Sequence, residues 1–205
     1  MMDFIELKKR VMEKGIKYSD YIKNTMDELS RTPSSELSPK ELKRFNFKSL
    51  NLQRSTRISK TYSPCYELKK LLANISEPQL WVAITENWCG DSAQSLPYIA
   101  AIAELNPLIE FKIILRDSNP DVMDMFLTNG TRSIPKIVAF NTVGNELFIW
   151  GPRPQYAVNL INEWKSEGLE KNEWTEKLHV WYAKNKGSEL EKEFIDLINK
   201  EVLMH

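Results

Sequence analysis

The chain has 205 residues, and its 28 Lys and Arg residues balance its 28 Asp and Glu residues. This length fits one sizeable domain with additional segments. The net charge of zero gives no sign of a nucleic-acid partner. No apolar run approaches the ~20 residues of a membrane span, and residues 1–17 carry charges throughout, unlike a signal peptide. Two cysteines, Cys65 and Cys89, exclude a disulfide framework and favour a cytoplasmic protein in a reducing compartment.

Residues 1–60 are predicted to form a helical N-terminal extension. Apolar residues at helical spacing indicate one helix that ends near Gly15 and a second over 18–29. A Ser-, Thr- and Pro-rich loop over 31–39 leads to a third helix, which a capping box of Ser38 and Glu41 should open. Its buried side is expected to contain Leu42, Phe45, Leu50 and Leu52, and its basic residues Arg54, Arg57 and Lys60 a solvated face.

Residues 61–168 alternate short apolar runs with amphipathic stretches, which predicts one domain of strands and helices. A helix should follow Ser63-Pro64, where a cap precedes a proline. The alternation, with a final hairpin, predicts an α/β fold whose mixed central sheet has helices on both faces. The expected strands cover 79–86, 109–115, 135–140 and 146–150, and the expected helices cover 92–105, 120–127 and 156–164.

Residues 169–205 are predicted to form a C-terminal helical extension that Gly187 interrupts. We expect these helices to pack beside the N-terminal ones on the flank of the core. They could instead narrow a groove near Cys89 or form a dimer surface, and the pattern leaves the oligomeric state open.

The segment Trp88-Cys89-Gly90-Asp91-Ser92 lies between a predicted buried strand and a predicted helix. Unpaired N–H groups and the helix dipole favour a thiolate at such a position. The carboxylates of Glu86 and Asp91 would oppose this effect, although Asp91 could instead turn its charge toward the N–H groups of the helix. On balance, the pattern predicts a moderately lowered pKa for the Cys89 thiol.

The same segment, followed by Arg132-Ser133-Ile134-Pro135 at the start of a later strand, resembles thioredoxin over about residues 64–165. With its terminal helices, the whole chain resembles a bacterial thioredoxin-like family of less defined role. The resemblance implies a thioredoxin-like fold with extra helices at both termini. It also implies a cis Ile134–Pro135 peptide bond against the Cys89 sulfur, beside backbone groups that pair with an extended substrate.

Two departures from thioredoxin concern the second half of its reaction. Ser92 stands where thioredoxin has its second cysteine, and Ala83 stands where it has a buried carboxylate. Without a second thiol, Cys89 cannot release a mixed disulfide internally. Ser92 can still donate a hydrogen bond to the thiolate, since it lies one helical turn away.

The resemblance therefore implies a monothiol thiol–disulfide oxidoreductase. Cys89, Ser92 and Pro135 would form the catalytic site, while an external thiol reductant would complete turnover on protein or low-molecular-weight disulfides. No cofactor or metal site is expected. The alternative is a non-catalytic adaptor that keeps the groove for protein recognition.

Substrate contacts are expected from Trp88, Gly90, Asp91, Ile134 and Arg153. By the resemblance, the loop of Arg153 borders the groove, so this residue is either a ligand for a substrate carboxylate or a surface arginine. Cys65 is either a resolving thiol or, more often for such a residue, a packed structural one. His179 is expected to pack in an aromatic helix and not to act as a catalytic base.

Overall fold

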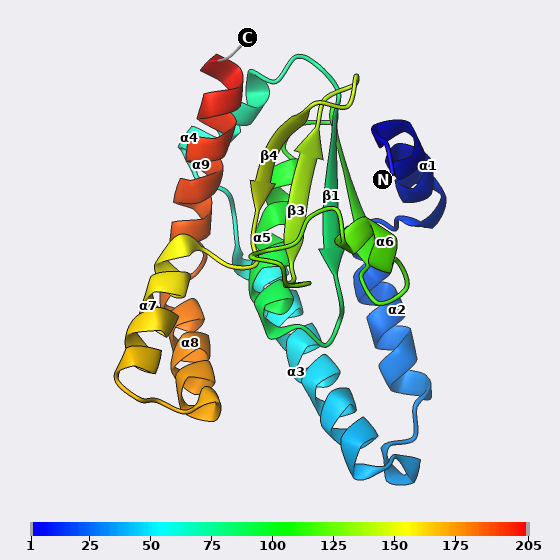
Figure 1. Cartoon of the computed structure of the whole chain (residues 1–205), viewed down its shortest axis with the longest axis vertical. Coiled ribbons are helices and arrows are strands. Elements are labelled where there is room, and N and C mark those ends of the chain that lie inside the picture. Colours follow the sequence, from blue (N-terminus) through cyan, green and yellow to red (C-terminus); the bar gives the residue numbers. More distant parts are fainter. Residues whose placement is uncertain (1, 204–205) are drawn as a thin grey trace.

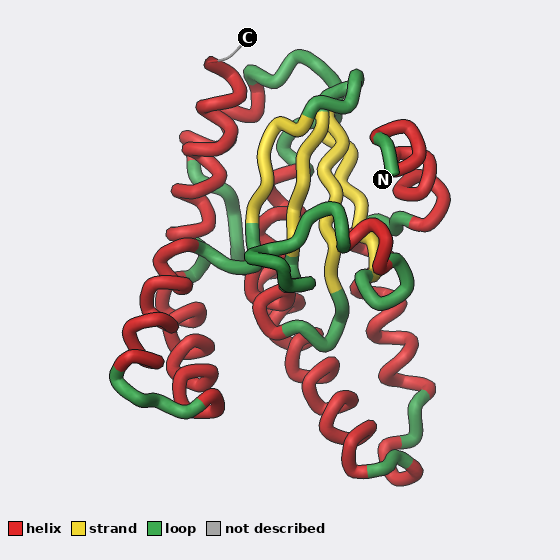
Figure 2. Tube along the Cα trace, in the orientation of Figure 1, coloured by secondary structure: helices red, strands yellow, loops and turns green. Residues whose placement is uncertain are grey.

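A computed structural model describes residues 2–203, in which four strands form one mixed sheet (Figure 2). Strand β1 (Gln79–Thr85) is parallel to β2 (Ile109–Leu115) and antiparallel to β3 (Lys136–Phe140). Strand β4 (Glu146–Trp150) pairs antiparallel with β3, which gives the order β2-β1-β3-β4. The structure confirms the predicted α/β class with a mixed central sheet and extra helices.

The helices surround this sheet, and one short 3₁₀ turn, η1, covers Ser34–Glu36 (Figure 1). Their bounds are α1 (Phe4–Lys14), α2 (Tyr18–Arg31), α3 (Pro39–Thr61), α4 (Tyr66–Ala73), α5 (Gly90–Ala103), α6 (Pro120–Met123), α7 (Gln155–Ser166), α8 (Lys171–Asn185) and α9 (Ser188–Leu203). No helix within residues 2–203 is both long and apolar enough to cross a membrane.

Alternate side chains of β1 enter separate apolar clusters because successive residues of a strand point to opposite faces. Trp81 and Ala83 pack in one cluster with α4, α5 and α9, whereas Leu80, Val82 and Ile84 pack in the other with α1 and α6. Both faces of the sheet are therefore covered by helices, which explains the almost continuous apolar sequence of β1.

Of the N-terminal helices, α1 lies apart from the C-terminal ones, whereas α3 lies beside α8, as expected of the two extensions (Figure 1). Ile16, which follows α1, forms a β-bridge with Ile113 on β2, and so reaches one edge. Helix α9 packs instead near β4 and α4, where Leu190, Phe194 and Ile198 enter the main core. Helix α1 and helix α9 thus lie near opposite edges of the sheet, whereas α3 and α8 meet.

Helix α3 begins with the capping box that the sequence predicts. The Ser38 side chain accepts from the Glu41 backbone N–H, and the Glu41 carboxylate accepts from the Ser38 N–H at 3.0 Å. These contacts satisfy N–H groups that the first helical turn leaves without partners.

Substitution of Ser38 by alanine is expected to lower the free energy of unfolding by about 1 kcal/mol, since one of these contacts is lost. Urea unfolding followed by circular dichroism measures the change. Ser38→Asn should restore most of the loss because asparagine also caps helices. Equal losses in the two variants would show that the cap contributes little here.

The buried side of α3 differs from the prediction. Leu42 and Leu50 are 37% and 41% exposed, whereas Asn51, Ser55 and Ile58 are buried. The first half of α3 extends beyond the sheet alongside α2, so only its second half packs on the core (Figure 1). There, the Ser55 hydroxyl donates to the Ala93 carbonyl on α5 at 3.3 Å.

Two helix boundaries also differ. Cys65, and not Ser63, is the N-terminal cap of α4: its carbonyl accepts from the Lys69 N–H, and its own N–H donates to the Glu191 carboxylate of α9 at 3.0 Å. Helix α6 ends at Met123 instead of near residue 127, because the next residues form tight turns, in which the Phe126 N–H bonds to the Met123 carbonyl.

Candidate functional site

Cys89 lies where the turn after β1 meets the first residue of α5. Its Sγ donates a hydrogen bond to the Ile134 carbonyl at 3.3 Å, and the peptide bond between Ile134 and Pro135 is cis. Cys89 is 9% exposed, and Ile134 and Pro135 are buried beside it. The structure therefore brings these three sequence-predicted residues together beneath the surface.

The pKa of the Cys89 thiol is raised, which makes the expectation of a lowered value wrong. Burial is the main cause, and the negative charge of Asp91 adds to it. Hydrogen bonds from the Ser92 hydroxyl and from the N–H groups of Ser92 and Asp91 act in the opposite direction, but more weakly. The N-terminus of α5 thus favours the thiolate less than removal from water disfavours it.

The Ser92 side chain is placed to donate a hydrogen bond to the Cys89 sulfur. Ser92 is 1% exposed, and its Oγ accepts a hydrogen bond from the Thr85 hydroxyl at 2.6 Å. Because Thr85 supplies that hydrogen, the hydroxyl hydrogen of Ser92 remains available for the Cys89 sulfur.

The two thiols belong to different parts of the core. Cys65 packs against the cluster around Trp81, whereas Cys89 belongs to the cluster on the opposite face of the sheet. Both cysteines are free. A resolving role for Cys65 would require the two faces to come into contact, so we treat it as a structural thiol.

Asp91 and Arg153 form an ion pair with each other. The Tyr182 hydroxyl also donates to the Asp91 carboxylate, at 2.8 Å. Asp91 was expected either to oppose the thiolate or to face backbone N–H groups, and Arg153 to bind a substrate carboxylate or lie on the surface. Instead, the pair joins the Cys89 turn to the loop before α7 and to α8.

That loop lies directly against Pro135. Gly151 has φ +113°, and a Cβ built on it would lie 2.2 Å from the Pro135 carbonyl oxygen, so only glycine fits. The close approach brings Arg153 to the turn that carries Asp91.

Trp88 and Glu86 make separate contacts beside the cysteine. The guanidinium carbons of Arg116 and Arg44 lie 4.9 and 5.4 Å from the centre of the Trp88 ring. The Glu86 carboxylate accepts from the Asp117 N–H at 2.7 Å, which gives it a partner other than the sulfur. Burial raises the pKa of Glu86.

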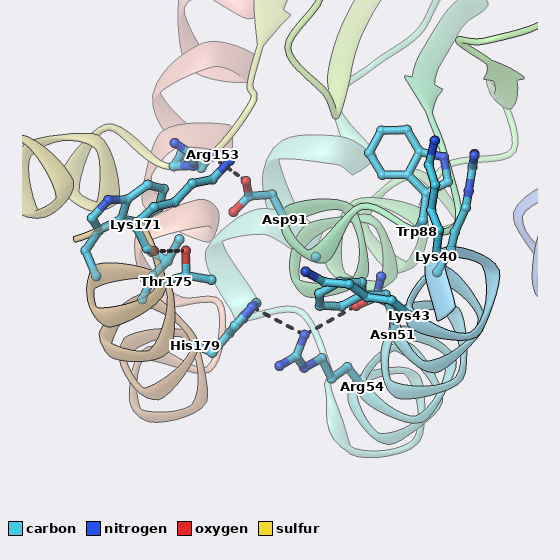
Figure 3. Close-up of a pocket in the computed structure, with 15 residues that line it drawn as sticks. Lys40, Lys43, Asn51, Arg54, Trp88, Asp91, Arg153, Lys171, Thr175 and His179 are labelled. Carbon is cyan, nitrogen blue, oxygen red and sulfur yellow. Dashed lines mark hydrogen bonds and ion pairs between the residues drawn. The ribbon is translucent and has the colours of Figure 1, made fainter. Parts of the chain in front are cut away.

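A cavity of about 560 Å³ opens beside the Cys89 turn, between α3 and α8 (Figure 3). Its wall includes Trp88 and Gly90, the two neighbours of Cys89, but not Cys89 itself. The remaining lining residues come from α3, the turn, the loop before α7, and α8: Lys40, Lys43, Arg44, Phe47, Asn51, Arg54, Asp91, Arg153, Lys171, Trp174, Thr175, Leu178 and His179.

Sequence reasoning missed the roles of Arg54 and His179, which meet across this cavity (Figure 3). Arg54 Nη1 and His179 Nε2 are 3.4 Å apart, and burial together with Arg54 lowers the pKa of His179 to about 4. A Cβ on Gly90 would lie 3.1 Å from the His179 ring, so the turn and α8 are in close contact. His179 is thus part of the cavity wall and not only of an aromatic cluster.

The sequence of α3 contains a pattern that indicates this wall. On α3, the basic and aromatic residues Lys40, Lys43, Phe47 and Arg54 are three, four and seven positions apart, and this spacing places them on one face. Among the residues 2–203, no group of three or more His, Cys, Asp or Glu side chains is placed to hold a metal ion.

Comparison with known proteins gives a family and a fold. A family model described as thioredoxin matches residues 40–165. No curated protein matches the chain. A protein of unknown function from Pseudomonas aeruginosa, PA1234, is similar in structure, with a TM-score of 0.61 and 15% identity over 98% of this chain and 99% of that one. An HIV epitope scaffold has a TM-score of 0.54 and 18% identity over 76% of this chain and 90% of its own.

Proposed function

The chain belongs to the thioredoxin family, and from this premise we propose that it performs thiol–disulfide exchange through a single cysteine, Cys89. The observation that supports this proposal best is the position of the sulfur. Cys89 Sγ lies at the start of α5 and 3.3 Å from the Ile134 carbonyl, beside Pro135.

In the proposed reaction, Cys89 first loses its proton to solvent. The thiolate then attacks one sulfur of a disulfide, so that a new S–S bond forms to Cys89 and the other sulfur leaves as a thiolate. Ser92 has no sulfur with which to break the new bond. An external thiol must therefore attack the mixed disulfide, which restores Cys89 and leaves the substrate half bonded to that thiol.

We propose that Ser92 and Pro135 position and stabilise the reacting sulfur. The residues proposed to contact the substrate beside it are Trp88, Gly90, Asp91 and Ile134. Arg153 would act through Asp91. Protein or low-molecular-weight disulfides are the proposed substrates, and a reducing cytoplasm would supply the external thiol. Because the pKa of Cys89 is raised, the exchange should be slow at neutral pH and accelerate as the pH increases.

A persistent mixed disulfide is the expected product when the Cys65→Ser protein reacts with oxidised glutathione at alkaline pH. Mass spectrometry of the intact protein should show one added glutathionyl group, and its removal should require an added thiol. Substitution of Ser92 by cysteine should shorten the lifetime of this adduct because an internal thiol can then release it.

The control is Cys65→Ser combined with Cys89→Ser, which should gain no mass. If the protein that retains Cys89 also gains none, although its thiol reacts after unfolding, the proposed exchange is wrong.

The second candidate is a thioredoxin-fold binding protein without turnover. The low exposure of Cys89, at 9%, and its raised pKa favour this function because both slow the attack of the sulfur. Failure of the mixed disulfide to form in a folded protein would support this second function.

A further inference from the structure

The cavity between α3 and α8 is strongly cationic. Its wall carries one carboxylate, Asp91, which already accepts from Arg153 and Tyr182. The cationic lining residues are Lys40, Lys43, Arg44, Arg54, Arg153 and Lys171. This excess is local, since the whole chain carries no net charge.

Most of these cations lack an anionic partner. Arg44 pairs with Asp117 at 3.5 Å. Among the side chains that the structure describes, no carboxylate lies within ion-pairing distance of Lys40, Lys43, Arg54 or Lys171. Burial and the charge of Arg57 lower the pKa of Arg54, so its positive charge is disfavoured where it stands. A bound anion would relieve that cost.

Three N–H groups of residues in the same wall also lack acceptors, and their nitrogen atoms are shielded from the open cavity. Within the described part of the chain, Trp88 Nε1, Arg153 Nε and His179 Nδ1 are buried and have no hydrogen-bond partner. Arg54 can only donate, so His179 Nε2 must accept from it, and the hydrogen of the neutral ring lies on Nδ1. Unsatisfied donors of this kind are costly unless an acceptor reaches them after a small side-chain shift.

Part of the remaining wall is apolar. Phe47, Trp174 and Leu178 line it together with the Trp88 ring. A volume of about 560 Å³ suits a small molecule and not a folded partner. The cavity therefore offers cations for charged oxygens, and aromatic surface for an uncharged body.

We propose that this cavity binds a small polyanion, a molecule with at least two carboxylate or phosphate groups joined to an apolar or aromatic body. Arg54, Lys43 and Lys171 bind the anionic groups, and Phe47 and Trp174 contact the body. The site goes beyond the proposed exchange reaction, because Cys89 is not part of its wall and its sulfur is not needed for binding.

The test uses the full chain with Cys65→Ser and Cys89→Ser, so that no thiol chemistry contributes. Isothermal titration calorimetry is performed with citrate, pyrophosphate, adenosine triphosphate and uncharged adenosine at low salt. We expect one-to-one binding of at least one polyanion, no comparable binding of adenosine, and weaker binding at high salt. Citrate and pyrophosphate distinguish a carboxylate ligand from a phosphate ligand, and adenosine triphosphate measures the gain from an aromatic body.

Arg54→Gln should weaken this binding at least about tenfold because a charge-assisted contact is lost. The control is Lys60→Gln, which removes an exposed cation of the same helix that does not line the cavity. Arg54→Lys keeps the charge and should retain most of the affinity, and thermal unfolding shows whether each variant is folded. Absence of saturable binding by every polyanion at millimolar concentration, or equal losses in the Arg54→Gln and Lys60→Gln proteins, would overturn the proposal.

Because the thiol-free protein is used, these results are independent of the exchange reaction. Binding without mixed-disulfide formation would leave the anion site standing and remove only the proposed reaction.

Discussion

Replacement of Asp91 by asparagine is expected to lower the pKa of Cys89 and to increase its alkylation rate at neutral pH about tenfold. The negative charge of Asp91 is the second cause of the raised thiol pKa, after burial. Asparagine removes this charge but can still accept the hydrogen bond from Tyr182. Arg153 loses its ionic partner and is then free to stabilise the thiolate.

The measurement is the rate of iodoacetamide alkylation against pH in a Cys65→Ser background. At pH values below the thiol pKa, the rate follows the thiolate fraction, so a lower pKa moves the whole rise of the profile toward neutral pH. Substitution of Asp196, an exposed carboxylate on α9, by asparagine provides the control and should leave the profile unchanged.

Arg153→Gln should act in the opposite direction. The Cys89 charge and the Arg153 charge stabilise each other, so loss of the guanidinium should raise the thiol pKa further and slow alkylation. If both variants move the profile in the same direction, the Asp91–Arg153 pair affects Cys89 through packing and not through charge.

The sheet and the start of α3 could be predicted because their signals are local. A run such as Leu80 to Ile84 has the length and composition of a buried strand whatever surrounds it. The capping box at Ser38 is likewise complete within four residues. The order of the elements then restricted the topology, since short connections and a final hairpin allow few arrangements.

The thiol pKa could not be predicted in this way because burial depends on distant segments. The turn around Cys89 contains a helix N-terminus, which favours the thiolate and is visible in the sequence. Removal of the sulfur from water depends on contacts with Ile134 and with apolar residues of α6, more than thirty positions further along the chain. The local effect was therefore identified and the larger, non-local one was not.

The cationic cavity was missed for the same reason. Arg54 on α3 and His179 on α8 are 125 positions apart, and each helix alone has the polar face of an ordinary solvated helix. The cations of the two helices surround one cavity only because the two helix faces meet beside Gly90. A basic stripe at helical spacing gives a binding site only when a second element encloses it.

Phe194→Ala is expected to lower the free energy of unfolding by about 3–5 kcal/mol, although Phe194 belongs to the predicted C-terminal extension. Its side chain is fully buried, and its ring centre lies 6.0 Å from that of Trp81, 5.8 Å from that of Phe148 and 5.7 Å from that of Trp150. Removal of the ring leaves a cavity against two strands of the sheet, β1 and β4, and the neighbouring aromatic rings can fill it only in part.

Urea unfolding measures this loss, with Phe47→Ala as the matched control. Phe47 is 47% exposed on the projecting half of α3, so the same change of side chain there should cost far less. A domain of this size has about 5–15 kcal/mol of stability, so a loss of the expected size would show that α9 completes the core. Equal, small losses would show instead that the sheet is stable without α9 and that residues after 169 are an accessory to a domain that ends at α7.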